Sequence, residues 1–343
     1  MTMPLLTLFR RPAVKMPLLL RLMLFVLLMG SSLSGWAACT LPSSTATFGS
    51  VSSFTVNTTV SNITANVNVN CGSGSVLSLL SSDYIKLQLA SATYTSSTRG
   101  ALKTSSTGTD LIPVRVCSDS ACATEMLVGG TAVTYSQAQL LNLVGVGGGQ
   151  NFTIPLYLRT VAGQVVAAGT YTVTLNILVS YSIFTGIGAL GLCVAGGQQT
   201  SSGTVPITTT LVITNDCTTI TAPNISFGSA PLVSSFSAVS QSINVICTKG
   251  STYTVGLSNG SHAVGTQRYM ISGTNLLAYE IYKNATTSRW GPTGTERVAS
   301  TAASSITTDG LTRTFTYTAR ILTSQTTPVA GSYSDSVVVD LSF

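Results

Sequence analysis

Charged residues are scarce in this chain of 343 residues, and histidine occurs once. Asp, Glu, Lys and Arg make up 8% of the chain, and four of the sixteen basic residues lie within the first 21 positions. The remainder carries twelve basic against ten acidic residues, a net charge of +2. It has no run of Lys or Arg and no mixing of basic with aromatic residues. The sequence therefore gives no reason to expect nucleic acid as a partner.

The groupings of side chains that catalysis or metal binding requires are also missing from the sequence. His262 stands in a turn, and nothing marks an activated nucleophile beside it. The glycine-rich run 145–149 lacks the spacing and the Lys-Ser/Thr pair of a phosphate-binding loop. Cys117 and Cys122 have no further Cys/His pair nearby, and their spacing favours a disulfide across a short hairpin over a metal or redox site. We therefore expect no enzyme, no cofactor and no metal.

We interpret residues 1–37 as a secretory signal peptide. Its basic residues precede the apolar run 22–29, and Gly35 and Ala37 suit cleavage before Ala38. Met16 is an alternative start, because the basic part is long. A lipoprotein with Cys39 as its lipidated residue is less favoured, since Trp36 stands where Leu is usual. We expect export through the periplasm.

Ser, Thr, Gly and Val dominate the rest of the chain, which is typical of an extracellular β protein. Short segments alternate apolar and polar residues between turns, and no convincing amphipathic helix occurs. These segments are 84–89, 112–116, 152–158, 171–179, 253–257, 277–282 and 315–321. This density of short strands predicts an all-β fold with two immunoglobulin-like β-sandwich domains.

Two stretches of the chain repeat one plan. Cys39, Phe48-Gly49 and Cys71 in the first correspond to Cys217, Phe227-Gly228 and Cys247 in the second. Each half is therefore expected to start with the same hairpin, held by one disulfide, Cys39–Cys71 or Cys217–Cys247. Gly169-x-Tyr171 and Gly331-x-Tyr333 then precede the closing strands. Cys193 is left over, either free or paired unexpectedly.

The segment that connects the two repeats has the pattern of a strand. Val205, Ile207, Thr209, Leu211 and Ile213 alternate with polar or small residues and stop four residues before Cys217. The first repeat has no comparable strand ahead of its first cysteine. We expect an N-terminal domain over 38–214 and a C-terminal domain over 215–343.

The second repeat resembles the spore coat protein U domain family. The resemblance rests on the cysteine and Phe-Gly pattern together with Arg268-Tyr-Met270, Trp290-Gly291 and Gly331-x-Tyr333-x-Asp335. The first repeat matches its opening and its Gly-x-Tyr, but has Val173 in the place of Asp335 and lacks the Trp-Gly. The whole plan is similar to the two-domain tip adhesins of Csu-type archaic chaperone-usher pili.

This resemblance implies that the C-terminal sandwich lacks its last strand. A donor strand from an adjacent pilin would then complete it, after a periplasmic chaperone and the outer-membrane usher have handled the groove. Val337, Val339, Leu341 and Phe343 are the expected subunit- and chaperone-binding residues. Little precedes Cys39 after cleavage, so we expect the chain at the pilus tip. The strand 205–213 is expected to complete the N-terminal domain from within the same chain.

Two apolar, glycine-rich segments, 140–149 and 183–194, occur only in the first repeat and look like long hairpin tips. The resemblance implies that they bind apolar abiotic or cell surfaces and so support biofilm formation. The expected surface-binding residues are Leu143, Val144, Val146, Ile183, Phe184, Ile187, Leu190 and Leu192. A third tip at 76–80 or 126–128 ranks lower.

Alternative interpretations of the apolar segments and of the whole chain remain open. The segments could instead fold onto the sandwich as core. A transmembrane helix over 177–194 is disfavoured, because Ser180, Ser182 and Thr185 interrupt it. A host-glycan lectin would need polar and aromatic loops, whereas these are aliphatic. A non-adhesive structural spore-coat or cell-surface protein is the other alternative.

Overall fold

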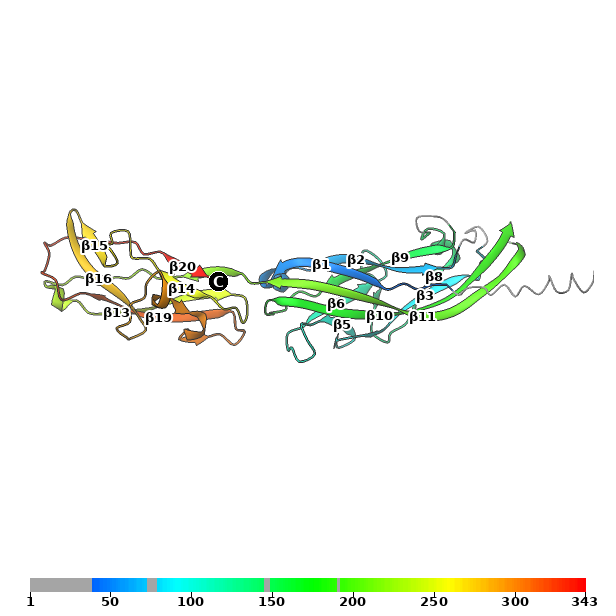
Figure 1. Cartoon of the computed structure of the whole chain (residues 1–343), viewed down its shortest axis with the longest axis horizontal. Helices are drawn as coiled ribbons and strands as arrows, with labels where there is room; N and C mark the ends of the chain where they lie inside the picture. Colours follow the sequence, from blue (N-terminus) through cyan, green and yellow to red (C-terminus); the bar gives the residue numbers. More distant parts are fainter. Residues whose placement is uncertain (1–38, 73–78, 145–148, 190–191) are drawn as a thin grey trace, which may run out of the picture. The chain divides into compact units, whose positions relative to one another are not determined.

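The computed structural model describes residues 39–72, 79–144, 149–189 and 192–343 (Figure 1). The predicted signal peptide lies outside these residues. The described chain is almost entirely β-structure, as predicted. It contains two separate hydrophobic cores, one built from residues between 39 and 213 and the other from residues between 217 and 341. We call the two parts domain one and domain two.

Domain one is a sandwich of two sheets. The first sheet has the order β1 (Ser44–Ser52), β11 (Leu192–Thr214), β10 (Gly169–Ala189), β3 (Tyr84–Ala92) and β8 (Val133–Ser136). The second has the order β2 (Asn62–Asn70), β9 (Asn151–Thr160), β6 (Ile112–Cys117), β5 (Arg99–Leu102) and β4 (Thr95–Ser96), with β7 (Glu125–Met126) beside β6. The packing follows from the alternation of side chains between the two faces of each strand. In β9, for example, Phe152, Ile154 and Leu156 are fully buried, whereas the residues between them are half-buried.

The prediction of a hairpin at the start of domain one is wrong, because β1 and β2 lie in different sheets. Thr40 pairs with Asn70, but β1 then crosses to the sheet opposite β2. A short helix α2 (Ser53–Thr58) makes the crossing, and the Ser52 side chain accepts a hydrogen bond from the N–H of Thr55 at its start. A second short helix, α3 (Gln137–Leu140), follows β8. Turns of this length leave no periodic signal in the sequence.

Strands β10 and β11 form the longest pairing of domain one. They run antiparallel from Gly169–Ile213 to Ala189–Leu192, with an irregularity after Ile187. Strand β3 pairs with β10 only as far as Tyr84 and Ser182. Figure 1 shows the two strands continuing as a ribbon past the end of β3. Residues 183–189 and 192–194 therefore belong to the part of β10 and β11 that pairs beyond the end of β3.

Domain two repeats the sandwich with fewer strands. One sheet has the order β12 (Cys217–Thr221), β13 (Val239–Cys247), β19 (Thr312–Ile321), β16 (Asn275–Lys283) and β15 (Arg268–Ser272), with β18 (Ser305–Ile306) beside β19. The other holds β17 (Val298–Ala299), β14 (Thr254–Leu257) and β20 (Val339–Ser342). Three turns of 3-10 helix lie in the connections between strands: η2 (Val233–Ser235), η3 (Gly294–Glu296) and η4 (Ser300–Ala302).

Three disulfides fix the cysteine pairs as predicted: Cys39–Cys71, Cys117–Cys122 and Cys217–Cys247. The first and third join the ends of equivalent segments in the two domains. Each closes a loop of about 30 residues, a length at which a disulfide typically stabilises by about 3 kcal/mol.

Candidate functional site

A groove lies beside β20 in domain two. Strand β20 pairs with β14 through Leu257–Val339 and Val255–Leu341, and no strand of the described chain pairs with its other edge. A cavity of about 350 Å³ opens between the segment 222–227 and the segment 333–339. Its lining is mostly apolar and aromatic: Ile225, Phe227, Ile243, Leu257, Met270, Tyr279, Ile281, Tyr317, Tyr333, Val337 and Val339, with polar Asn224, Ser334, Asp335 and Ser336 among them.

The four residues predicted for subunit binding lie on or beside this groove. Val337 and Val339 line it, and Leu341 packs against the same core from β20. Phe343 is 67% exposed, with its ring centroid 6.1 Å from that of Tyr253. Phe227 and Tyr333 also line the groove. They belong to the repeated Phe-Gly and Gly-x-Tyr motifs, which did not reveal that the two residues share one groove.

Asp335 anchors the chain where it enters β20. Its carboxyl group accepts hydrogen bonds from the Tyr279 hydroxyl at 2.7 Å and from the backbone N–H of His262 at 3.2 Å, and the His262 ring Nδ1 lies 3.0 Å away. The Asp335 side chain is only 2% exposed. Burial, followed by the hydrogen bond to Asp335, raises the pKa of Tyr279 above its ordinary value. The only histidine is thus a partner of a structural carboxyl group.

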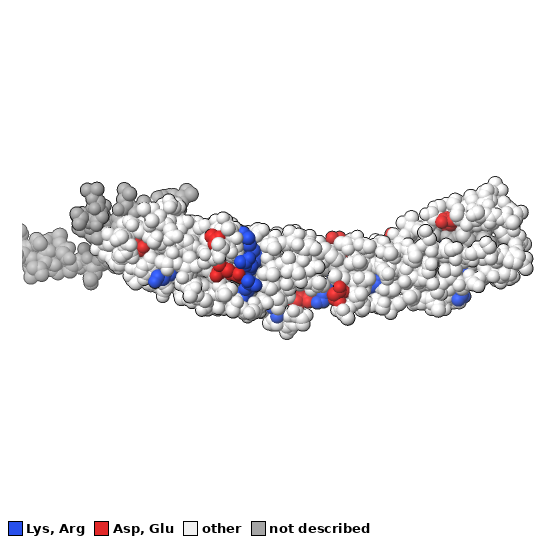
Figure 2. Space-filling view, turned by 180° about the vertical axis from the view of Figure 1, so that it is seen from behind, with Lys and Arg blue, Asp and Glu red and all other residues white. Residues whose placement is uncertain are grey.

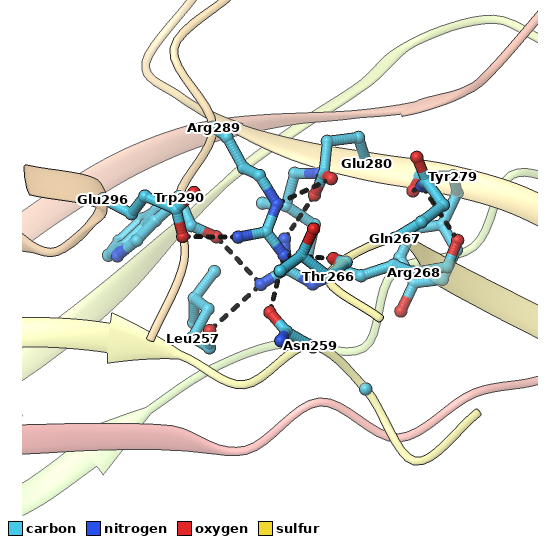
Figure 3. Close-up of polar contacts among 12 residues, drawn as sticks. Leu257, Asn259, Thr266, Gln267, Arg268, Tyr279, Glu280, Arg289, Trp290 and Glu296 are labelled. Atoms are coloured by element: carbon cyan, nitrogen blue, oxygen red, sulfur yellow. Dashed lines mark hydrogen bonds and ion pairs between the residues drawn. The ribbon is translucent and has the colours of Figure 1, made fainter. Parts of the chain in front are cut away.

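A buried ionic network supports the wall behind the groove (Figure 3). The Arg268 side chain is fully buried, pairs with Glu280, and donates to the carbonyl oxygens of Leu257 at 3.0 Å and Trp290 at 2.8 Å. Arg289 joins Glu280 and Glu296 at 2.9 and 2.5 Å. Burial lowers the pKa of Arg268, and Glu280 opposes that effect. The network ties β15 and β16 to the end of β14, which bounds the groove.

In domain one the edge that corresponds to this groove is filled. Strand β10 pairs antiparallel with β3, as β20 pairs with β14. The other edge of β10 pairs with residues 192–213 of β11. Strand β1 covers the far edge of β11 in parallel register, from Ser44–Ile207 to Ser52–Thr214. Val205, Ile207, Leu211 and Ile213 are all buried in the core.

The structure describes only part of the apolar segments of domain one. Leu143 and Val144 are half-buried: Leu143 packs against the core, and Val144 bridges to Phe152. Val146 and Leu190 lie outside the described residues, as does most of the lower-ranked segment 76–80. Ile187 and Leu192 lie on β10 and β11, and their side chains lie outside the described part.

Two of the predicted surface-binding residues are wrong. Ile183 is 0% exposed and Phe184 is 4% exposed, and neighbouring Thr185 is also buried. The apolar alternation of Val179 and Tyr181 continues to Ile183, which therefore still belongs to the sandwich part of β10. Phe184 points to the opposite face of the strand and is buried there, where its backbone N–H and carbonyl bond the side chains of Asp83 and Gln150.

The surface of the described chain carries few charges. Figure 2 shows large uncharged areas on the face in view, interrupted by a cluster of acidic and basic residues. Among the described residues no group of three or more His, Cys, Asp or Glu side chains could hold a metal ion. Within that same part, no helix is long and apolar enough to span a membrane.

Comparisons with solved structures give a shared fold. A chain of the CsuC-CsuE chaperone-tip adhesion subunit pre-assembly complex, from archaic chaperone-usher Csu pili of Acinetobacter baumannii, matches with a TM-score of 0.53 and 22% identity. The match covers 89% of this chain and 100% of that chain. The CupB6 tip adhesin from Pseudomonas aeruginosa matches with a TM-score of 0.36 and 12% identity, over 88% of this chain and 94% of that chain. No curated protein matches.

The sequence itself matches one domain family twice. The Spore Coat Protein U domain matches residues 26–178 and residues 202–340. The two matches fall on the two sandwiches and together take in most of the chain, which therefore belongs to the spore coat protein U domain family.

Proposed function

We propose that the chain is the adhesive tip subunit of an archaic chaperone-usher pilus. The observation that carries this proposal is the groove of domain two, which has an unpaired strand edge on β20 and an apolar, aromatic floor. An exposed edge above apolar residues is a template for another strand.

Domain two accepts a strand from an adjacent pilin in this proposal. Main-chain hydrogen bonds to β20 provide affinity, and alternate side chains of the incoming strand enter the groove. A periplasmic chaperone covers the groove before assembly, and an outer-membrane usher exchanges it for the pilin. The shared fold with a chain of a chaperone-tip adhesion subunit complex supports this order of partners. The predicted leader 1–37 directs export to the periplasm, and from there to the cell surface.

Domain one, over residues 38–214, is complete by itself in this proposal. Residues 205–213 of β11 fill the edge of β10 and bury four apolar side chains there. Domain one therefore needs no donor strand from another subunit. It is free to act as the binding domain.

The far end of the β10–β11 hairpin and the neighbouring loop form the proposed contact surface. Leu143, Val144, Val146, Ile187, Leu190 and Leu192 carry the apolar contact, whereas Ile183 and Phe184 support it from the core. With few charges nearby to hold water, apolar side chains at this end favour hydrophobic abiotic or cell surfaces, which would promote attachment and biofilm formation.

Two adjacent valines of domain two test the groove. Val339 lines it, whereas Val338, the residue just before β20, is 63% exposed. We expect Val339→Asp to abolish the soluble complex that the exported chain forms with the chaperone encoded beside it. Val338→Asp should leave that complex intact. Equal complex formation by the two variants, measured by co-purification, would remove the basis of the proposal.

A second experiment tests the contact surface. Piliated bacteria whose chain carries Leu190→Ser and Leu192→Ser are expected to lose most adhesion to polystyrene. The control is Leu232→Ser, which alters an apolar side chain of domain two that is 53% exposed. Normal piliation with undiminished adhesion of the double variant would show that the hairpin end is not the contact.

A further inference from the structure

Two polar side chains are buried where β10 leaves the sandwich of domain one. Strand β3 pairs with β10 as far as Ser182, and Phe184 follows two residues later. There the carboxyl group of Asp83 accepts a hydrogen bond from the Phe184 N–H at 3.1 Å, and the amide of Gln150 donates to the Phe184 carbonyl at 2.6 Å. Asp83 is 1% exposed and Gln150 0%. Side chains thus occupy the edge of β10 where a neighbouring strand would continue.

Asp83 joins three separate segments of domain one. Besides the Phe184 N–H on β10, it accepts from the backbone N–H of Leu80 at 2.9 Å and from the Gln198 amide of β11 at 2.8 Å. The same Gln198 nitrogen lies 2.9 Å from the Ser182 hydroxyl on β10. One carboxyl group therefore connects the approach to β3 with both arms of the long hairpin.

Gln150 connects Phe184 with the chain around Cys71 and Gly72. Its backbone N–H donates to the Gly72 carbonyl, and its carbonyl accepts from the Cys71 N–H, each at 3.0 Å. The Gln137 side chain of α3 donates to the Leu79 carbonyl at 2.8 Å. In the sequence, Asp83 and Gln150 follow the apolar segments 76–80 and 140–149, and Phe184 lies within the third, 183–194. The ends of all three are therefore linked at Phe184.

We propose that Asp83 and Gln150 form a polar joint that holds the described ends of these three segments together, with Asp83 as a positioning residue for surface binding. This inference rests on the proposed adhesive function. Separate apolar loops would lose conformational freedom each time they settle on a surface, and this loss weakens binding. The joint imposes the arrangement during folding. Hydrogen bonds suit this task better than apolar contacts, because their direction fixes the angle between segments.

The test compares three substitutions in the exported full-length chain. Asp83→Ala removes the acceptor of all three hydrogen bonds. Asp83→Asn keeps an oxygen that can still accept from the Leu80 and Phe184 N–H groups. Asp119→Ala is the matched control, since Asp119 also accepts two backbone N–H bonds, from Ala123 and Thr124, but in the Cys117–Cys122 turn. The groove of domain two is the same in all variants, so any difference in adsorption arises in domain one.

Adsorption to polystyrene beads and backbone hydrogen exchange are measured on each variant. Asp83→Ala is expected to raise exchange in peptides covering 79–84 and 182–198 and to weaken adsorption by about fivefold to tenfold, the equivalent of one or two hydrogen bonds. Asp83→Asn should retain most of the adsorption, and Asp119→Ala all of it. Exchange in domain two should not change.

Each outcome decides a separate point. If exchange rises in Asp83→Ala while adsorption stays at the wild-type level, Asp83 does not position the contact surface. Unchanged exchange overturns the joint itself. If the wild-type chain does not adsorb, the adhesive function fails, and the exchange data still judge the joint. If Asp83→Ala does not fold, Gln198→Ala replaces it, because this variant removes one bond of Asp83 at an exposed position. The joint then requires faster hydrogen exchange in peptides covering 182–198, and unchanged exchange overturns it.

Discussion

The two domains share one plan and differ at one edge. In domain one, β10 has β3 on one side and β11 on the other; in domain two, the equivalent β20 has β14 on one side and a groove on the other. The strand that fills the edge in domain one comes from the connection between the domains. In the proposed assembly, this difference gives a duplicated sandwich a direction: one copy fills its own edge, and the other presents an edge to a neighbouring subunit.

The largest expected effect comes from separating the domains. A fragment of residues 39–214 should be monomeric and unfold cooperatively, and removal of 204–214 from it should abolish folding, because β11 buries Val205, Ile207, Leu211 and Ile213. A fragment of residues 215–343 should aggregate through its open edge. Gel filtration and thermal unfolding measure both. A soluble, cooperative domain two would erase the distinction between the edges.

The second prediction compares two arginines, one in each domain. Arg268→Ala in domain two should destabilise by about 3–5 kcal/mol, since it leaves Glu280 buried without that partner. Arg99→Ala in domain one should cost less than about 1 kcal/mol, because the Arg99–Glu125 pair is partly exposed and Arg115 also binds Glu125. Urea denaturation distinguishes the two. Equal losses would mean that the incomplete domain depends on its ionic network no more than the complete one does.

The third prediction concerns β11, which domain two lacks. The hydroxyl of buried Thr209 has no hydrogen-bond partner among the described residues. Thr209→Val should therefore stabilise domain one by about 1 kcal/mol, because it removes an unsatisfied polar group at nearly constant volume. Thr208→Val is the control, and it should not stabilise, since the Thr208 hydroxyl is 3.2 Å from that of Thr174. A drop in the melting temperature of Thr209→Val would contradict this packing of β11.

The smallest expected effect appears in alkali and concerns Tyr279 of domain two. The pKa of Tyr279 is raised above its ordinary value of 10.0, because burial and Asp335 favour the protonated phenol. The folded state thus holds this proton more tightly than the unfolded chain does. Its contribution to stability is complete below about pH 10 and declines as the pH rises further. Tyr279→Phe should flatten that decline in a series of melting temperatures.

The sequence predicted much of this fold because alternation and spacing are local signals. Each of the alternating segments became a strand, and the three disulfides followed from the cysteine spacing. Ile183 and Phe184 were misplaced because the glycines that follow them suggested a loop. The apolar alternation of β10 extends to Ile183, and Phe184 is buried on the opposite face of the strand, which no local pattern indicates.

Other features depend on which distant segments meet, and the sequence does not carry that information locally. Asp83 and Arg268 look like ordinary surface residues in a sequence, since only the tertiary structure shows that they are buried and which groups pair with them. The groove likewise combines Phe227, Met270 and Tyr333 from three separate segments. The alternation of apolar residues at 337–343 indicated only the side of the groove that β20 forms.

Strand β11 also has a mechanical consequence for the proposed tip. It runs without interruption from Leu192, at the far end of the hairpin, to Thr214, and β12 begins at Cys217. A pull between an attached surface and the pilus would load this strand lengthwise. Its hydrogen bonds to β1 and β10 would then be sheared together, and a pairing sheared as a unit resists force better than one opened bond by bond. Adhesion under flow would therefore depend on the strand that also closes the sandwich.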